Sequence, residues 1–176
     1  MPLVIRKADA ADAARLALIA SATFAFACPP HTSAAGIQQF ISSTLSEARF
    51  DEYLADGQRT LFLAESDGLP VGYTMVVMGE PTDPDVARAL ATRPTAELSK
   101  CYVLPGHHGR GVAHRLMELS VQSAHAQGAA AVWLGVNNEN GRANRFYEKS
   151  GFVAVGTKTF LVGEELEHDF VRERVL

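Results

Sequence analysis

The segment from Val103 to Ala113 constrains the fold of this chain more than any other. It reads Val-Leu-Pro-Gly-His-His-Gly-Arg-Gly-Val-Ala, so a strand-like run ends in proline and glycine before helix-forming residues resume. Gly109 and Gly111 permit the backbone angles of a tight turn, and Ala113 is small enough for close approach. Because the free N–H groups and the dipole of such a helix end attract phosphate, the segment predicts a strand, turn and helix that bind a phosphate-bearing ligand.

Two common phosphate-binding motifs do not fit this segment. A Walker loop requires G-x-x-x-x-G-K-[ST], which the chain does not contain. A dinucleotide fingerprint requires a third glycine, and His114 stands at that position. On this segment alone, a glycine turn without any ligand remains the alternative.

Hydrophobic periodicity and turn residues predict the other elements of the 176-residue chain. An Asp67-Gly68 pair indicates a hairpin, and Pro29 and Pro30 end the first long helix. The segment 79–94 has three prolines and is expected to be a loop with a helical turn at 86–90. The order predicts one mixed α/β domain over residues 1–176, with strands at 3–6, 60–65, 71–77, 97–104, 131–136, 152–161 and 168–175, and helices at 9–27, 33–55 (broken near Ser46), 109–127 and 140–150.

Composition narrows the classes of function. Sixteen Lys and Arg residues against twenty Asp and Glu give a net charge of −4, whereas nucleic-acid and anionic-membrane binders cluster Lys and Arg. The longest apolar run, 16–28, is shorter than the ~20 residues of a membrane span. The two cysteines fit no disulfide framework, and the cysteines and histidines fit no metal-ligand spacing. We therefore expect a cytoplasmic protein with no metal that binds neither nucleic acid nor a membrane.

A second segment adds specificity to the first. It begins at a capping asparagine, forms a helix and ends at Gly151. Together the two segments read His108-x-x-Gly111-x-Ala113 and Asn140-x-x-Ala143-x-x-Phe146-Tyr147-Glu148-Lys149-x-Gly151-Phe152. This paired pattern closely resembles the Gcn5-related N-acetyltransferase (GNAT) family, and the resemblance runs from the first strand to the last. It implies the α+β GNAT fold, a mixed, mostly antiparallel sheet of six or seven strands flanked by helices, with two central strands splayed apart.

The resemblance implies acetyl-coenzyme A as co-substrate, held between the splayed strands 97–104 and 131–136. Backbone groups of one strand would pair with its pantetheine arm as an added strand does. The N–H groups of the glycine turn would hold the pyrophosphate. The family usually has Gln or Arg at position 108, where a neutral imidazole still donates one hydrogen bond. The cofactor-binding residues expected from this resemblance are Cys101, Tyr102, Val103, His108, Gly109, Arg110, Gly111, Val112, Ala113 and Asn140.

Two residues are candidates for catalysis. Tyr147 aligns with the family's general acid, and its phenol can donate a proton to the departing thiolate; packing beside Phe146 is the alternative. An alkyl amine has a pKa near 10.4, so Glu97, ahead of the cofactor turn, is a candidate base. It could equally orient the substrate or be a surface residue. The backbone N–H of Val103 or its neighbour is expected to polarise the carbonyl, and direct transfer is preferred to a covalent Cys101 intermediate.

Within the family the chain looks most like bacterial polyamine N-acetyltransferases. The resemblance rests on Glu97-Leu98-x-Lys100-x-Tyr102-Val103-Leu104, on Trp133-Leu134-Gly135-Val136, and on Asp169; it departs at Asn137, where that subgroup often has an aromatic residue. The expected acceptor is a primary amine, with a polyamine as first candidate and some of Phe24, Phe26 and Phe40 along its cleft. An amino acid, an antibiotic amine, a protein N-terminus or a non-catalytic acetyl-CoA sensor are the alternatives. A homodimer is one of the assemblies that the resemblance allows.

Overall fold

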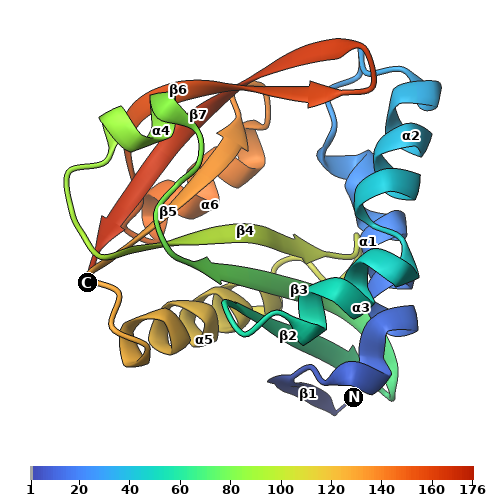
Figure 1. Ribbon diagram of the computed structural model, residues 1–176. Coiled ribbons are helices and arrows are strands. Elements are labelled where there is room, and N and C mark those ends of the chain that lie inside the picture. The colour runs from blue at the N-terminus through green and yellow to red at the C-terminus, as the bar shows by residue number, and fades with distance from the viewer. Residues whose placement is uncertain (1) are drawn as a thin grey trace.

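A seven-stranded sheet forms the centre of the computed structural model, which describes residues 2–176 (Figure 1). Its strand order is β1-β2-β3-β4-β5-β7-β6, and every neighbouring pair is antiparallel except β4 and β5. This arrangement confirms the mixed, mostly antiparallel sheet implied by the resemblance. The strands are β1 (Leu3–Lys7), β2 (Arg59–Ser66), β3 (Leu69–Met78), β4 (Thr95–Val103), β5 (Ala131–Asn137), β6 (Val153–Val162) and β7 (Glu165–Val175).

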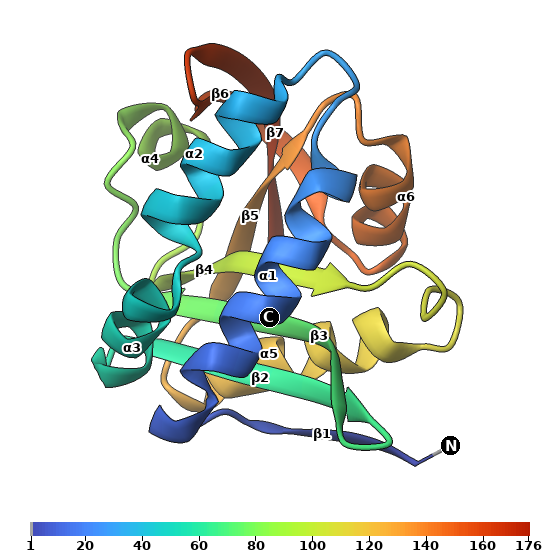
Figure 2. The same cartoon turned by 90° about the vertical axis from the view of Figure 1, so that its right-hand side faces the viewer.

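Helices cover both faces of this sheet. Figure 2 shows α1, α2 and α3 in front of the strands, whereas α5 lies behind them. Ser33 and Ser46 cap α2 and α3, so the helical break predicted near Ser46 is the start of a new helix. The helices are α1 (Ala13–Ala27), preceded by a 3-10 turn (Ala10–Asp12), α2 (Ala34–Thr44), α3 (Glu47–Ala55), α4 (Pro84–Ala89), α5 (Val112–Ala126) and α6 (Gly141–Lys149).

The N-terminal helix packs as a core helix. The stretch Ala10–Ala27 is the one stretch within residues 2–176 long and apolar enough, by length and composition, to cross a membrane. Its buried face, which includes Leu16 and Phe24, contacts the residues of β2 and β3. At its start the buried Asp12 receives two hydrogen bonds of 2.8 Å from Arg6 on β1. The helix therefore has one face in the core and one in solvent.

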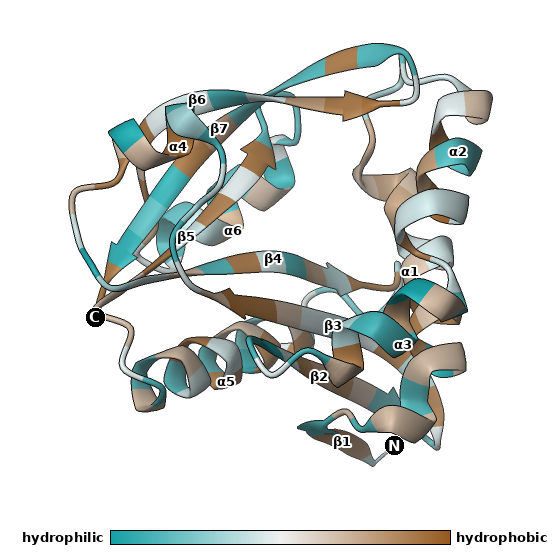
Figure 3. Cartoon of the chain, viewed as in Figure 1, coloured by the Kyte–Doolittle hydropathy of each residue, from teal (hydrophilic) through white to brown (hydrophobic). Residues whose placement is uncertain are grey.

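The hydrophobic core has one cluster on each face of the sheet. Phe50 and Tyr73 lie between the sheet and helices α1 to α3, and Met117 and Phe152 lie on the side of α5 and α6. Full burial of a Met or Phe side chain contributes about 1.5–3 kcal/mol. Figure 3 shows β3 hydrophobic over much of its length, consistent with burial on both faces, whereas β6 and β7 carry many polar residues.

The last hairpin is longer than predicted. Strand β6 continues to Val162 and β7 starts at Glu165, so only Gly163 and Glu164 form the turn. Gly163 has a φ of 63°, which suits the first position of a tight hairpin turn. The acidic composition of residues 164–167 is typical of a loop. Pairing with β6 nevertheless extends β7 through it.

Strands β4 and β5 separate soon after they start. They are paired over only three residues each, Thr95–Glu97 with Ala131–Trp133. Beyond that point they diverge, as Figure 1 shows, and the edge of β4 that faced β5 has no strand beside it. This confirms the splay of two central strands, which opens a wedge in the sheet.

Candidate active site

A glycine turn lies at the end of β4, before α5. Gly109 and Gly111 have φ values of 82° and 73°, a backbone region that favours glycine. A Cβ placed on either residue would meet no atom within 4 Å, so the turn faces open space. The helix starts at Val112, slightly later than predicted, because Gly111 at its N-cap is still left-handed.

The N-terminus of α5 differs from those of α2, α3, α4 and α6. In each of those four helices a side chain caps a first-turn N–H group. Gly111 has no side chain to do this, so the first-turn N–H groups of α5 remain available to an anion. The predicted residues from His108 to Ala113 thus form an open cradle of the type that binds phosphate.

The open edge of β4 continues from this cradle. The Leu104 N–H donates to the Val71 carbonyl on β3 at 2.8 Å. Backbone groups alternate in direction along a strand, so the N–H and C=O of Val103 and Cys101 point the other way, toward the wedge. His108 Nε2 donates a hydrogen bond of 2.8 Å to the Val103 carbonyl. The His108 side chain is thus engaged with backbone.

Tyr102 differs from its two neighbours. It lies opposite Tyr73 in the register, so its backbone groups face β3 and not the wedge, in contrast to the expectation that they pair with a ligand. Its ring stacks on Tyr73 with a centroid distance of 5.9 Å. What Tyr102 contributes to the site is therefore its aromatic side chain, on the face covered by α1.

Tyr147 lies on the opposite face of the sheet, where α6 packs. Its ring contacts Phe146 and Phe152 with centroid distances of 5.2 and 5.9 Å. Its hydroxyl faces the Cys101 thiol closely enough that each group shifts the pKa of the other. Burial raises the pKa of Tyr147 well above its usual value, which keeps the phenol protonated. Burial also raises the pKa of Cys101 to about 12, so its thiol is a poor nucleophile.

A β-bulge determines the direction of two charged side chains on β4. Lys100 is opposite Met75 and Leu98 is opposite Val76, so Ser99 has no partner. Glu97 is opposite Val77. Because Met75 and Val77 are two residues apart and both pack toward α1, Glu97 and Lys100 share that face. The bulge thus places a carboxylate and an ammonium side by side in the wedge.

Burial shifts the pKa values of both Glu97 and Lys100. It raises the pKa of Glu97, although the charges of Lys158, Lys100 and Arg59 oppose that rise. It lowers the pKa of Lys100 to about 8, and the Glu97 charge opposes the fall. Glu97 is therefore a carboxylate whose proton affinity exceeds that of a surface glutamate, as a general base needs.

Lys158 of β6 lies near enough to Glu97 that its charge acts on that carboxylate. Its ammonium lies 3.4 Å from Asp169 on β7, and both side chains are largely buried. A Cβ at Gly135 of β5 would stand 2.5 Å from Lys158 Cε, so the bare glycine leaves room for this side chain. Lys158 also borders a depression of about 370 Å³ between α4 and β6. Strand β6 thus contributes a cation to a site built mainly on β4.

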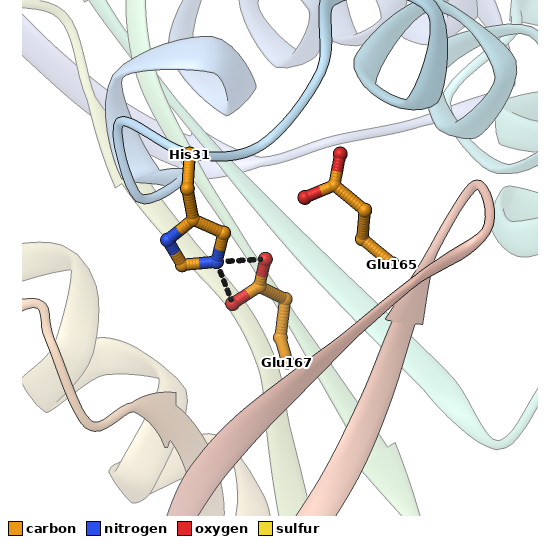
Figure 4. Close-up of side chains that lie close together, drawn as sticks. All are labelled: His31, Glu165 and Glu167. Carbon is orange, nitrogen blue, oxygen red and sulfur yellow. Dashed lines mark hydrogen bonds and ion pairs between the residues drawn. The ribbon is translucent and has the colours of Figure 1, made fainter.

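The loop between α1 and α2 is attached to the β6–β7 hairpin (Figure 4). The buried Glu167 accepts hydrogen bonds from three residues, namely from His31 Nε2 at 3.0 Å and Thr32 Oγ1 at 3.1 Å in this loop and from Asn137 Nδ2 at 3.2 Å on β5. Glu165 accepts the Ser33 N–H at 2.8 Å. We call this group of residues the loop clasp. Ligand atoms of His31, Glu165 and Glu167 lie within 4.8 Å of one another, a spacing that a divalent cation could bridge, but protein donors already occupy the Glu167 carboxylate.

Aromatic residues form one wall of the cleft on the α1 side. Phe24 stacks on Phe40 with a centroid distance of 4.4 Å, and Phe40 meets Phe160 of β6 edge-on at 5.4 Å. The three rings therefore connect α1, α2 and β6. Phe26, the third candidate for this wall, is 71% exposed and stands apart from them.

Asn140 lies at the start of α6, across the wedge from the glycine turn. Its Oδ1 accepts the Ala143 N–H at 3.1 Å, which is the predicted cap. This bond leaves its Nδ2 group free to donate. The residue thus has a structural role in addition to the predicted ligand contact.

The splayed sheet, with an open anion cradle at its mouth, defines the fold class of the N-acetyltransferases. The acetyltransferase (GNAT) family profile matches residues 27–152. An uncharacterised N-acetyltransferase of Mycobacterium tuberculosis is 45% identical over 165 residues, covering 94% of this chain and 98% of that protein. The chain belongs to the acetyltransferase (GNAT) family and is an N-acetyltransferase.

Solved structures agree with this assignment at the level of the fold. The PaiA N-acetyltransferase of Thermoplasma acidophilum, in complex with coenzyme A, has a TM-score of 0.78 at 18% identity over the full length of both chains. The yncA protein of Salmonella typhimurium, solved with acetyl-CoA, has a TM-score of 0.66 at 20% identity, covering 100% of this chain and 95% of that one.

Proposed function

We propose that this enzyme transfers the acetyl group of acetyl-CoA directly to a primary amine. One observation carries the proposal: β4 separates from β5 directly after Glu97 and ends at the uncapped turn of α5. A single open strand edge thereby connects a candidate base, the Tyr147–Cys101 contact and an anion cradle. Acetyl-CoA has the matching parts in order, an acetyl thioester, an extended amide-bearing arm and a pyrophosphate.

The residues present fit such a ligand. The outward backbone groups of Cys101 and the Val103 carbonyl would pair with the arm, as a strand edge pairs with an extended peptide. The N–H groups from His108 to Ala113 would hold the pyrophosphate, and Asn140 would contact the ligand from the α6 side. When bound, acetyl-CoA supplies the acetyl group and the thiolate leaving group.

Glu97 and Tyr147 act from opposite faces of the sheet. Glu97, on the α1 face, takes a proton from the bound ammonium and releases it to solvent, so that the neutral amine attacks; the nitrogen loses its second proton by the same route as it bonds to the carbonyl carbon. The Val103 N–H faces the wedge and stabilises charge on the carbonyl oxygen. As the carbon–sulfur bond breaks, Tyr147 on the α6 face donates its proton to the thiolate and regains one from solvent. Cys101 stays protonated, which favours direct transfer over a covalent intermediate.

A polyamine is the acceptor that the subgroup resemblance suggests. The Glu97 carboxylate on the acceptor side supports a cationic substrate, whereas Asp169 and Glu167 are already engaged by protein groups. Lys100 and Lys158 on the same side oppose one that is cationic throughout. The experiment that tests the proposed function is thiol release from acetyl-CoA with a panel of polyamines, amino acids, aminoglycosides and peptides. Binding of coenzyme A without thiol release in the presence of any amine would instead support a non-catalytic sensor.

A further inference from the structure

Lys100 is a charged group of the cleft that the transfer step leaves unused. The β-bulge at Ser99 turns it to the acceptor side, next to Glu97. Its side chain is half-buried, its ammonium is not among the fully buried polar atoms, and within residues 2–176 no hydrogen bond or ion pair engages it. A partly desolvated cation gains from an anion placed beside it. The Lys100 ammonium is therefore open to pairing with an anion of the substrate.

The neighbouring charged groups do not fill that need. The Asp169 carboxylate already pairs with Lys158 at 3.4 Å, and the Asp56 carboxylate already pairs with Arg59 at 3.1 Å. Glu97 stabilises the Lys100 charge, yet the two make no direct ion pair. If Glu97 receives the acceptor's ammonium, the remaining charge that acts on Lys100 is the cation of Arg59.

We propose that the acceptor amine also bears a carboxylate, which Lys100 binds while the amine meets Glu97. The inference rests on the proposed function and specifies its substrate as an amine of the amino-acid or peptide type. Lys100 is then a specificity-determining residue. A polyamine would place a second ammonium near Lys100, where like charges repel.

The spacing of the two groups suits such a ligand. The cross-strand partners of Glu97 and Lys100 are two residues apart on β3, which corresponds to about 7 Å along the strand. Both side chains are long enough to converge on one small molecule. An amine and a carboxylate separated by one to a few carbons fit between them.

Matched pairs of amines test this inference. One pair is 4-aminobutyrate and butylamine, in which a carboxylate replaces the terminal methyl group; another is leucine and 3-methylbutylamine, in which it replaces a hydrogen. With acetyl-CoA fixed, we expect kcat/KM to be about tenfold or more higher for the carboxylate-bearing member, the effect of one charge-assisted hydrogen bond. Spermidine, measured alongside, is expected to be a poorer acceptor than either amino acid.

Three variants complete the test. Lys100→Met should reduce the ratio within each pair by about tenfold, and Lys100→Arg should retain part of it because the charge remains. Lys7→Met, which removes an exposed lysine of β1, should leave the ratio unchanged. A general structural defect would lower the rates of both members of a pair and leave their ratio intact.

A pH series gives an independent readout. The Lys100 pKa of about 8 means that its charge is present at pH 7 and lost as the pH rises past that value. The charged groups that act on it are Glu97 of β4 and Arg59 of β2, with Lys158 of β6 acting on Glu97. The ratio for 4-aminobutyrate and butylamine should therefore fall between pH 7 and pH 9.5, and the fall should be absent in Lys100→Met.

The outcomes distinguish the role of Lys100 from the proposed transferase activity. Acetylation of amines without preference for the carboxylate-bearing member, or a preference that survives Lys100→Met, overturns this inference and leaves the proposed transferase intact. Failure of every amine to release thiol while coenzyme A still binds overturns the proposed function and this inference with it.

Discussion

The chemistry of this site depends on two side chains that the sheet keeps apart. Glu97 projects toward α1, and Tyr147 approaches the same strand from α6. The proposed base for the amine and the proposed proton donor for the thiolate therefore lie on different sides of β4. Each residue can be removed without disturbing the other, so single substitutions distinguish their roles.

Replacement of Tyr147 by Phe removes the proposed proton donor and keeps the ring contacts with Phe146 and Phe152. We expect kcat to fall about a hundredfold or more, the usual contribution of a general acid. Thiol release under saturating acetyl-CoA measures this. Tyr53→Phe is the matched control, because its hydroxyl bonds the Thr44 carbonyl within the N-terminal helices, far from the wedge. Wild-type turnover in Tyr147→Phe would show that the phenol only packs.

Replacement of Glu97 by Gln removes the proposed base without a large change in volume. Because burial raises the pKa of Glu97, its charged form is lost at a higher pH than for a surface glutamate. The wild-type rate should therefore fall as the pH drops through that raised value, and this acidic limb should disappear in Glu97→Gln. A profile of kcat/KM from pH 5 to 9 measures both. An unshifted acidic limb in the variant would assign Glu97 to orientation only.

At the scale of elements, the glycine turn and α5 act as one unit. A strand ends, two glycines adopt left-handed angles, and a helix starts without a side-chain cap. The cradle is thus formed by backbone groups, and the left-handed angles of its two glycines shape it.

Replacement of Gly111 by Ala tests this unit. Its φ of 73° is unfavourable for alanine by about 1–2 kcal/mol, and the added methyl group would project into the open cradle. Gly128, at the other end of α5, has a φ of 101° and the same free space, so Gly128→Ala is the matched control. We expect similar losses of stability in both, measured by thermal unfolding. Only Gly111→Ala should weaken coenzyme A binding in calorimetry, and equal binding in both variants would contradict an anion role.

The elements were predictable from sequence where local signals are strong. The Asp67-Gly68 hairpin, the break at Ser46 and the helix after Gly111 follow from turn and capping preferences, and all three are present. The cofactor cradle and Tyr147 were accessible through motif spacing. Helix α5 shows the limit: Leu119 and Ser123 continue the helical spacing of Val112 and Leu116, yet Met117, Ser120 and Val121 are buried in their place, because the sheet decides which face of the helix is covered.

Other features depend on contacts between distant segments. No local signal in β4 reveals the bulge at Ser99, since it arises only in pairing with β3. The role of Lys100 is hidden for the same reason: an unbroken strand would turn it to the other face. The pairing of Lys158 with Asp169 over Gly135 requires three strands in register. Such placements are set by tertiary structure and not by spacing in the chain.

At the scale of the whole molecule, the wedge divides the sheet into two halves, β1 to β4 and β5 to β7. Only three residue pairs join β4 to β5. On the acceptor side, the two halves are also held by the aromatic contact of Phe40 with Phe160 and by the loop clasp. Residues 31 and 167 are 136 positions apart, so the clasp closes a long stretch of chain around the cleft.

Replacement of Glu167 by Ala tests whether the clasp shapes the acceptor cleft. The change leaves Thr32 and Asn137 without their acceptor in a buried place, which costs about 1–3 kcal/mol and lowers Tm by several degrees in a protein of this size. Because the clasp is on the acceptor side, we expect KM for the amine to rise more than KM for acetyl-CoA. Asp12→Asn is the control, since it breaks the buried Arg6 pair beneath α1 and should lower Tm without changing the ratio of the two KM values. A parallel rise of both KM values in Glu167→Ala would show that the clasp supports the fold as a whole and not the acceptor cleft in particular.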